Sequence, residues 1–146
     1  MRTLRALCAV GAVAALLAAC SSTGDFNRNV DLTKYHAVYV SKNISVFDQR
    51  YLPPVLSALR QDGFKIVDTA ESPDTLTLKF ATDTANLNHY RVAIQLWTKD
   101  QVAIDAEAKN SGWGNLLASD SAVRDLVSRA VAQMQKQIRK SEQSSY

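Results

Sequence analysis

The chain has 146 residues, of which 47% are hydrophobic and 21% charged, with five glycines and three prolines. This composition is typical of an ordinary globular domain and excludes a disordered or wholly membrane-embedded chain. The 17 basic residues exceed the 14 acidic ones by only three. Such a small excess does not predict the strongly basic patch of a nucleic-acid-binding protein, so we expect no nucleic-acid partner.

The N-terminal segment has the organisation of a secretion signal. Arg2 and Arg5 precede an uncharged run from Ala6 to Ala19 that is rich in Ala, Leu and Val. A membrane-spanning helix needs about 20 apolar residues, so this run is too short to span a bilayer. We therefore predict a removable signal over residues 1–19. Its removal leaves 15 basic residues against 14 acidic ones.

The apolar run ends in Leu17-Ala18-Ala19-Cys20. This motif resembles the lipobox of bacterial lipoproteins, which implies cleavage between Ala19 and Cys20 and acylation of the Cys20 thiol. The membrane is then a partner through that lipid. A plain secretory signal with an Ala-x-Ala cleavage site is the alternative, but the spacing and the polar residues that follow favour the lipobox. Cys8 leaves with the signal, so no disulfide is expected in the mature chain.

The residue after the acylated cysteine influences sorting in Gram-negative lipoproteins, where Asp favours retention in the inner membrane. Ser21 occupies that position. The resemblance therefore implies the periplasmic face of the cell outer membrane, with the inner membrane as the alternative.

The mature chain divides into three parts. Residues 20–33 are polar and lack periodicity, which predicts a lipidated N-terminus and a flexible tether. Residues 34–140 are numerous enough for one hydrophobic core, which predicts a single domain. The polar residues 141–146 predict a disordered tail.

The domain begins with a predicted strand over the aromatic and β-branched residues 35–40. Apolar residues then recur with helical spacing from Leu52 to Leu59, and Gly63 stands where a glycine commonly ends a helix. A strand over 64–67 follows. Three segments then alternate apolar and polar residues, as half-buried antiparallel strands do: 76–80, 90–97 and 102–109.

An apolar stripe through residues 123–138 predicts a final helix over 120–140. The order β-α-β-β-β-β-α therefore predicts the α+β class. We expect a two-layer sandwich with a mostly antiparallel sheet and two helices on one face.

Two motifs within the domain are similar to those of known envelope lipoproteins. The segment 59–67 combines a helix end, Gly63-Phe64 and a strand, and the segment 92–97 reads V-x-I-x-L-W. The arrangement resembles the N-terminal domain of the Tol β-propeller protein, the curli-secretion channel lipoprotein and uncharacterised envelope lipoproteins. It covers most of residues 34–140. This resemblance implies a fold and transfers no active site.

No catalytic, metal-binding or cofactor-binding constellation is apparent, so we predict no catalytic residue, no metal and no cofactor. His36 and His89 lack the neighbouring ligands of a metal site. Asp105 and Glu107 share the polar face of one predicted strand and could do acid–base chemistry. A cross-strand charge ladder with Arg91 and Lys109 is the favoured interpretation.

The aromatic residues are the best candidates for a binding surface. Trp97 ends a strand on its predicted outer face, Trp113 stands between two glycines, and Tyr51 precedes the first helix. Trp and Tyr commonly anchor protein interfaces. The competing interpretation, which the sequence favours, is that a second layer of helix or loop covers Trp97 and that Trp113 fills one end of the core.

These observations favour a non-enzymatic interaction or assembly module of the cell envelope whose partner is another envelope protein. A carrier of a small apolar ligand or lipid is the second interpretation and predicts a cavity lined by Leu78, Ile94 and Leu126. A hydrolase is the third and would require polar groups that converge in a cleft.

Overall fold

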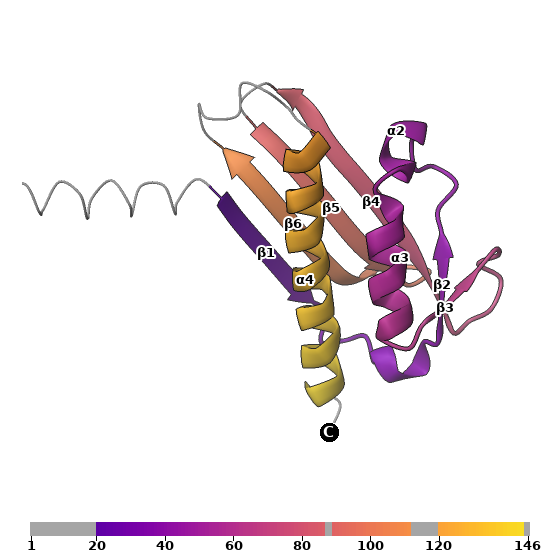
Figure 1. Ribbon diagram of the computed structural model, residues 1–146. Helices are drawn as coiled ribbons and strands as arrows, with labels where there is room; N and C mark the ends of the chain where they lie inside the picture. The colour runs from indigo at the N-terminus through magenta and orange to yellow at the C-terminus, as the bar shows by residue number, and fades with distance from the viewer. Residues whose placement is uncertain (1–19, 87–88, 112–119, 145–146) are drawn as a thin grey trace, which may run out of the picture.

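The computed structural model describes residues 20–86, 89–111 and 120–144. The predicted α+β two-layer sandwich is confirmed, with a six-stranded sheet in one layer and helices in the other (Figure 1). The elements in chain order are β1 (Cys20–Phe26), η1 (Leu32–Lys34), β2 (Ala37–Val40), α2 (Val46–Gln49), α3 (Leu52–Gln61), β3 (Lys65–Val67), β4 (Thr75–Asn86), β5 (His89–Trp97), β6 (Val102–Ser111) and α4 (Asp120–Ser144).

The sheet has the strand order β1-β6-β5-β4-β2-β3. The pairs β1–β6, β6–β5 and β5–β4 are antiparallel, whereas β2 is parallel to both β4 and β3. The parallel pair β2–β3 is joined by α3, because parallel neighbours need a crossover connection. The sheet is therefore mostly antiparallel, as predicted.

The helices α3 and α4 lie side by side on one face of the sheet and enclose the core (Figure 1). Leu78 of β4 and Ile94 of β5 are completely buried there, as are Leu59 of α3 and Met134 of α4. The apolar stripes identified in the sequence thus meet in one core between the two layers.

The turn from α3 to β3 follows the predicted glycine termination. Gly63 has φ +92°, a backbone conformation that costs glycine little. The amide of Gly63 donates to the carbonyl of Arg60 at 3.1 Å, and the amide of Phe64 donates to that of Leu59 at 3.0 Å. These bonds satisfy carbonyls at the helix end and aim the chain directly into β3.

The predicted flexible tether over residues 20–33 is wrong for most of its length. Residues 20–26 form β1 at the edge of the sheet, where Cys20 is the register partner of Asn110 and Phe26 that of Ile104. Val30 and Leu32 are buried in the core. The polar sequence did not reveal this strand, because an edge strand is held mainly by backbone hydrogen bonds that any side chain permits.

The predicted disordered tail over 141–146 is also wrong for residues 141–144, which belong to α4. Ser141 is buried, and its hydroxyl donates to the carbonyl of Ile138 at 2.9 Å. The buried face of α4 passes through Met134 and Ile138 to Ser141, so a polar residue occupies the last position of the apolar stripe. The end of α4 packs near η1. Most of η1 lies in the segment for which the sequence predicts a tether.

Gly24 provides a test of the observed β1 strand. A Cβ added there would lie 3.0 Å from Nε2 of Gln137 and 3.3 Å from the carbonyl oxygen of Asp105. We expect Gly24→Val to lower the free energy of unfolding by about 1–3 kcal/mol, because the added side chain overpacks the contact between β1 and α4. Denaturant melts of the two proteins would measure this loss.

The neighbouring Thr23→Val is the matched control. Thr23 is exposed and already β-branched, so its replacement should change the free energy of unfolding by about 0.5 kcal/mol or less. Equal stability of Gly24→Val and Thr23→Val would show that residues 20–26 do not pack as β1.

Candidate functional site

The residue proposed to carry the lipid is the first residue of β1. Cys20 pairs in register with Asn110 of β6, and Ser21 pairs with Lys109. The Ser21 side chain is exposed. Ala19 and the rest of the predicted signal lie outside the described residues. A chain attached to lipid at Cys20 would therefore enter the folded sheet without an intervening linker.

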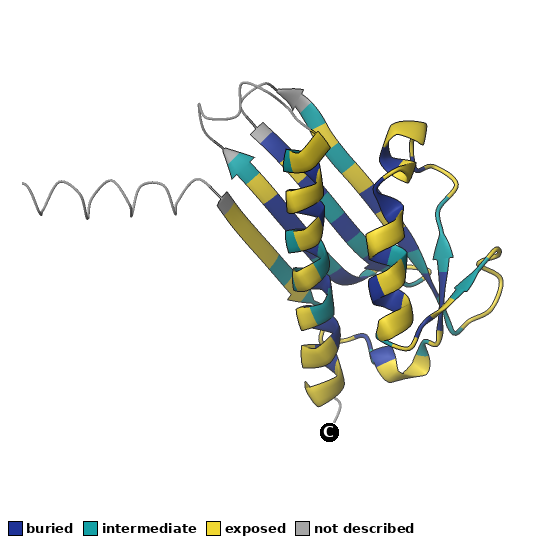
Figure 2. Ribbon diagram, viewed as in Figure 1, coloured by how far each residue is buried: buried dark blue, intermediate teal, exposed yellow. Residues whose placement is uncertain are grey.

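The face of the sheet opposite α3 and α4 is not covered by a helix in the described part of the chain (Figure 2). Side chains of β4, β5 and β6 that point to this outer face are mostly polar and, apart from the buried Ala103 and Glu107, are partly or fully exposed. They alternate with the buried residues of the core, as expected for a sheet with one solvated face. This outer face is a broad surface on which a partner could dock.

Trp97 lies on the outer face, as the sequence predicts. Its side chain is half-buried, and the Lys79 ammonium nitrogen is 3.7 Å from the centroid of its ring. The indole Nε1 donates to Oε1 of Gln95 at 3.0 Å, and Nε2 of Gln95 donates to Oδ1 of Asp105 at 3.0 Å. Both the ring face and the polar end of Trp97 are thus held in a defined orientation.

A groove of about 780 Å³ lies beside Trp97. Thr77, Lys79 and Trp97 belong to strands that line it, and the segments 70–73 and 98–101 add to the lining. The second segment is the β5–β6 turn, where the Thr98 amide donates to the Gln101 carbonyl at 2.9 Å. This groove combines an aromatic ring with charged side chains on an open face.

The predicted charge ladder on the outer face is confirmed for Glu107, Arg91 and Lys109, whereas Asp105 accepts a hydrogen bond from Gln95. Glu107 is 9% exposed and forms ion pairs with Arg91 and Lys109, the latter at 2.6 Å between Nζ and Oε1. Burial alone would raise the pKa of the Glu107 carboxyl. The hydrogen bonds and positive charges of Lys109 and Arg91 outweigh burial and hold this pKa below its ordinary value. An ion-paired carboxylate explains this cluster without any acid–base role.

Glu107→Gln should lower the free energy of unfolding at pH 7 by about 1–3 kcal/mol, because two cations lose their partner. A lowered folded-state pKa stabilises the fold above the unfolded-state pKa, and this stabilisation is lost as the pH falls through the folded-state value. The difference between the variant and the wild type should therefore shrink in acid. Denaturant melts over a pH series would measure it.

Asp100→Asn serves as the control for this substitution. Asp100 is exposed in the β5–β6 turn, so we expect a change within about 0.5 kcal/mol at every pH. A constant penalty for Glu107→Gln across the whole series would contradict the ion-pair interpretation.

Tyr51 is wrong as a candidate docking residue. It is 2% exposed, and its hydroxyl donates to Oδ1 of Asp120 at 2.8 Å. Burial, followed by this hydrogen bond and the Asp120 charge, raises the pKa of Tyr51. Tyr51 therefore connects the start of α3 to the first residue of α4. The position of Tyr51 before a helix predicts an accessible ring. The contact with α4 that buries it depends on the tertiary fold, which local sequence does not reveal.

The remaining sequence candidates form no site within the residues that the structure describes. Trp113 lies outside the described residues, and the side chain of His89 is not described. His36 is exposed and precedes β2. Among residues 20–86, 89–111 and 120–144, no group of three or more His, Cys, Asp or Glu side chains is arranged to hold a metal ion.

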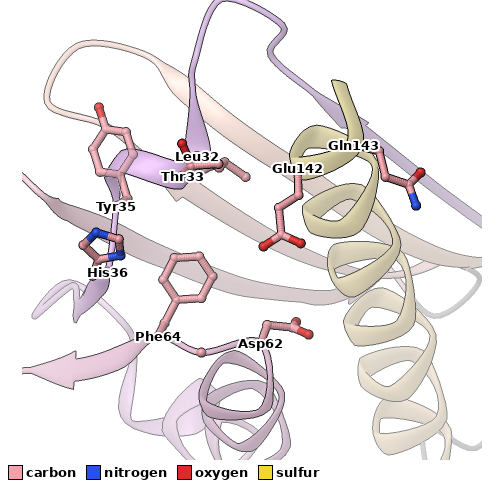
Figure 3. A pocket seen from close by; sticks show the side chains of 9 residues that line it. Leu32, Thr33, Tyr35, His36, Asp62, Phe64, Glu142 and Gln143 are labelled. Carbon is pink, nitrogen blue, oxygen red and sulfur yellow. The ribbon is translucent and has the colours of Figure 1, made fainter. Parts of the chain in front are cut away.

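A second pocket, of about 480 Å³, lies where η1, the α3–β3 turn and the end of α4 meet (Figure 3). The rings of Tyr35, His36 and Phe64 lie on one side of it, and the carboxylates of Asp62 and Glu142 lie toward α4. Two of these residues, Tyr35 and His36, come from the segment before β2. The pocket thus joins segments that are far apart in the sequence.

Asp62 has an unusual environment at the edge of this pocket. Its Oδ2 atom is buried and makes no hydrogen bond, while Nε2 of Gln135 lies 3.5 Å from Oδ1. Burial raises the pKa of the Asp62 carboxyl, although the hydrogen bond from Gln135 and the charge of Arg139 act in the opposite direction. Sequence reasoning missed this residue, because Asp62 reads as an ordinary polar residue at a helix end.

Sequence reasoning also missed α2, a short helix between β2 and α3. The hydroxyl of Ser45 accepts from the amide of Asp48 at 3.1 Å and donates to the Asp48 carboxylate at 2.7 Å. The spacing Ser45-x-x-Asp48 is typical of a helix start and could have revealed this element.

No helix in the described ranges has both the length and the apolar character needed to cross a bilayer.

Comparisons with known proteins find no family model that matches the chain and no match among curated proteins. Among solved structures, a single-substitution variant of the PelC dodecamer from Paraburkholderia phytofirmans is similar, with a TM-score of 0.44 and 12% identity. The PelC dodecamer from the same organism, in another crystal form, has a TM-score of 0.42 and 12% identity. Each match covers 80% of this chain and 98% of the other. Likeness at this level assigns no function.

Proposed function

We propose that this protein is a lipoprotein anchored through acyl chains on Cys20, and that it acts as a non-enzymatic interaction module of the cell envelope. The observation that carries the proposal is the outer face of the sheet, which no helix of the described residues covers, with the groove beside Trp97. Its partner is another envelope protein. The proposed location is the periplasmic face of the outer membrane, for which Ser21 after the acylated cysteine is the support.

The arrangement of β1 supports an anchoring role for Cys20. β1 is paired with β6 along its whole length, which holds Cys20 at the edge of the sheet. Acyl chains on Cys20 would hold the domain next to the bilayer, so a partner need only bind a domain that is already localised. A modest docking surface is sufficient under this condition, because the lipid supplies a high effective concentration.

The groove beside Trp97 has the features of a small protein-binding surface. A half-buried indole provides a large apolar contact that is already oriented by Gln95 and Lys79, so little conformational freedom is lost on binding. Charged residues of both signs, including Lys99 and Glu71, surround it. These features favour an extended or turn segment of a partner chain with its own polar groups.

Site-specific photo-crosslinking in intact cells tests the proposed docking surface. A photoreactive residue at Lys99, on the rim of the groove, should crosslink to a partner, whereas one at the exposed Arg60 of α3 should not. Trp97→Ala should reduce the Lys99 crosslink about tenfold, since interface tryptophans commonly contribute more than about 1.4 kcal/mol.

The thermal unfolding of Trp97→Ala provides the necessary control. We expect a nearly unchanged melting midpoint, because Trp97 lies on the outer face rather than in the core. Crosslinks of equal yield at Lys99 and Arg60, or an undiminished Lys99 crosslink in folded Trp97→Ala, would contradict the proposed surface.

A small-ligand carrier is the second candidate function, and the environment of Asp62 is the observation that favours it. The cavity expected from the sequence would involve Leu78, Ile94 and Leu126, but these side chains are buried in the packed core. The pocket in Figure 3 is a better site for a small molecule, because its lining combines the rings of Tyr35, His36 and Phe64 with the carboxylates of Asp62 and Glu142. Native mass spectrometry of protein purified from cells would detect such a ligand.

A further inference from the structure

The short helix α2 presents apolar side chains to solvent. Val46 is 85% exposed and Phe47 is 42% exposed, and these two are the large hydrophobic residues classed as exposed in the described part of the chain. They are neighbours in the sequence at the start of α2, on the side of this helix that does not pack against the sheet. Exposed apolar residues that adjoin one another favour an interaction site over chance exposure.

The sheet register places α2 toward the same end of the domain as Cys20. The amide of Thr82 in β4 donates to Oδ1 of Asp48 at 3.2 Å, which ties α2 to that position of the strand. Thr82 pairs with Val92, Val92 with Ala108, and Ala108 with Ser22. This series of paired residues runs across the sheet from the strand position bonded to α2 to Ser22, which is two residues from Cys20 on β1.

A second contact and the ribbon agree with this placement. The hydrogen bond between Tyr51 and Asp120 joins the residue that follows α2 and precedes α3 to the first residue of α4. Figure 1 shows the start of α4, the end of β4 and α2 toward the end of the molecule at which β1 begins. Three strand intervals separate β1 from β4, a distance of roughly 14 Å. Cys20 and α2 are therefore two separate points toward one end of the domain.

The charges around α2 are distributed in favour of an anionic surface. The guanidinium carbon of Arg50 lies 4.6 Å from the centroid of the Phe47 ring, and Lys42 is exposed in the loop before α2. The one acidic residue of α2, Asp48, is buried and hydrogen-bonded to Ser45 and Thr82. Nearby, Asp120 is paired with Arg124 at 2.6 Å. The accessible charges next to Val46 and Phe47 are thus mainly positive.

From this juxtaposition we infer that α2 is a second membrane contact, in which Val46 and Phe47 enter the interfacial region of the bilayer while Arg50 and Lys42 contact anionic headgroups. The inference rests on the proposed acylation of Cys20, which brings this end of the domain to the membrane. An apolar pair flanked by cations is the composition of peripheral membrane contacts. Long basic side chains can extend to the headgroups while neighbouring apolar side chains enter the acyl boundary.

Two contacts would fix the orientation of the domain on the membrane. A lipid alone leaves the domain free to pivot about Cys20, whereas α2 adds a second point across the sheet. The nine residues of β5 lead away from this end toward Trp97, a path of roughly 30 Å along an extended strand. The groove beside Trp97 is then held away from the bilayer, where a partner can reach it.

Fluorescence of a probe at position 46 tests the contact in the full mature protein. The acylated protein is purified, reconstituted into vesicles of phosphatidylethanolamine and phosphatidylglycerol, and labelled with an environment-sensitive fluorophore at Val46→Cys. Because Cys20 is acylated and Cys8 belongs to the predicted signal, the introduced thiol is the one available for labelling. Lipids brominated on their acyl chains then quench a probe that lies within the interface.

The matched control carries the probe at Lys99→Cys, in the exposed turn at the far end of β5. We expect at least fivefold stronger quenching at position 46 than at 99, together with a blue shift of the emission. Adding Phe47→Glu should reduce quenching at 46 toward the value at 99, and circular dichroism melts should show that the variant remains folded. Replacing phosphatidylglycerol with phosphatidylcholine should weaken the effect.

Equal quenching at positions 46 and 99, in vesicles that the protein floats with, would overturn the membrane contact and leave the anchor intact. The membrane contact would also be overturned if a photoreactive residue at position 46 crosslinks to a protein in cells while the labelled probe in vesicles stays unquenched. Absence of acyl chains from the purified protein would overturn the proposed anchoring and the contact together. Mass spectrometry and flotation distinguish that failure from the first.

Discussion

Replacing Cys20 by alanine should abolish the incorporation of labelled fatty acid and shift the protein from the membrane fraction to the soluble fraction. The sulfur of Cys20 is the proposed site of diacylglycerol attachment, and alanine offers no nucleophile. Each buried methylene of an acyl chain contributes about 0.8 kcal/mol, so the loss of two or three chains removes effectively permanent attachment. Metabolic labelling and fractionation of cells would measure both effects.

Cys8→Ala is the matched control for this experiment. Cys8 lies in the predicted signal, so its loss should leave both labelling and fractionation as in the wild type. Equal labelling of wild type and Cys20→Ala would refute the lipoprotein proposal. It would also remove the reason for placing the β1 end of the domain at a membrane.

Leu78→Ala should lower the free energy of unfolding by about 2–5 kcal/mol, the usual penalty for emptying a packed core site. Leu78 is fully buried on the inward face of β4 and is the register partner of Leu96, which is also fully buried. Truncation leaves a cavity beneath α3 and α4 that the two layers can fill only in part. Urea or guanidinium melts would measure the change.

Lys79→Ala, one residue along the same strand, is the control for the choice of face. Its side chain points to the outer face, where the ammonium group lies over the Trp97 ring. The loss of an exposed cation–π contact should cost about 1 kcal/mol or less. Similar losses for Leu78→Ala and Lys79→Ala would show that β4 does not separate a buried face from a solvated one.

The parts of the fold that the sequence predicts correctly are those with a local periodic signal. Helical spacing located α3, and Gly63 marked its end where the structure has φ +92°. Alternation located β4, β5 and β6 and assigned the correct inward residues, including Ile94. Since β5 and β6 are adjacent antiparallel strands, the same alternation also predicted the contacts of Glu107 with Arg91 and Lys109.

The errors have a different physical origin. Residues 20–26 have no apolar period, yet they pair with β6 and accommodate α4 where Gly24 meets Gln137. The sequence around Tyr51 predicts an exposed aromatic residue, but the fold brings Asp120, which is distant in the sequence, next to its hydroxyl. The groove beside Trp97 and the pocket at Asp62 likewise depend on segments that are not consecutive in the chain.

The sequence by itself therefore determined the α+β class, the main helices and central strands, and which side chains of those strands face the core. These properties follow from the match between hydrophobic period and backbone geometry, which is local. Only the tertiary structure decided that β1 occupies the sheet edge, that β2 is parallel to its neighbours, and that α2 lies toward the same end as Cys20. Strand pairing depends on backbone hydrogen bonds between distant segments, and those bonds are available to every residue except proline, so side-chain periodicity does not encode them.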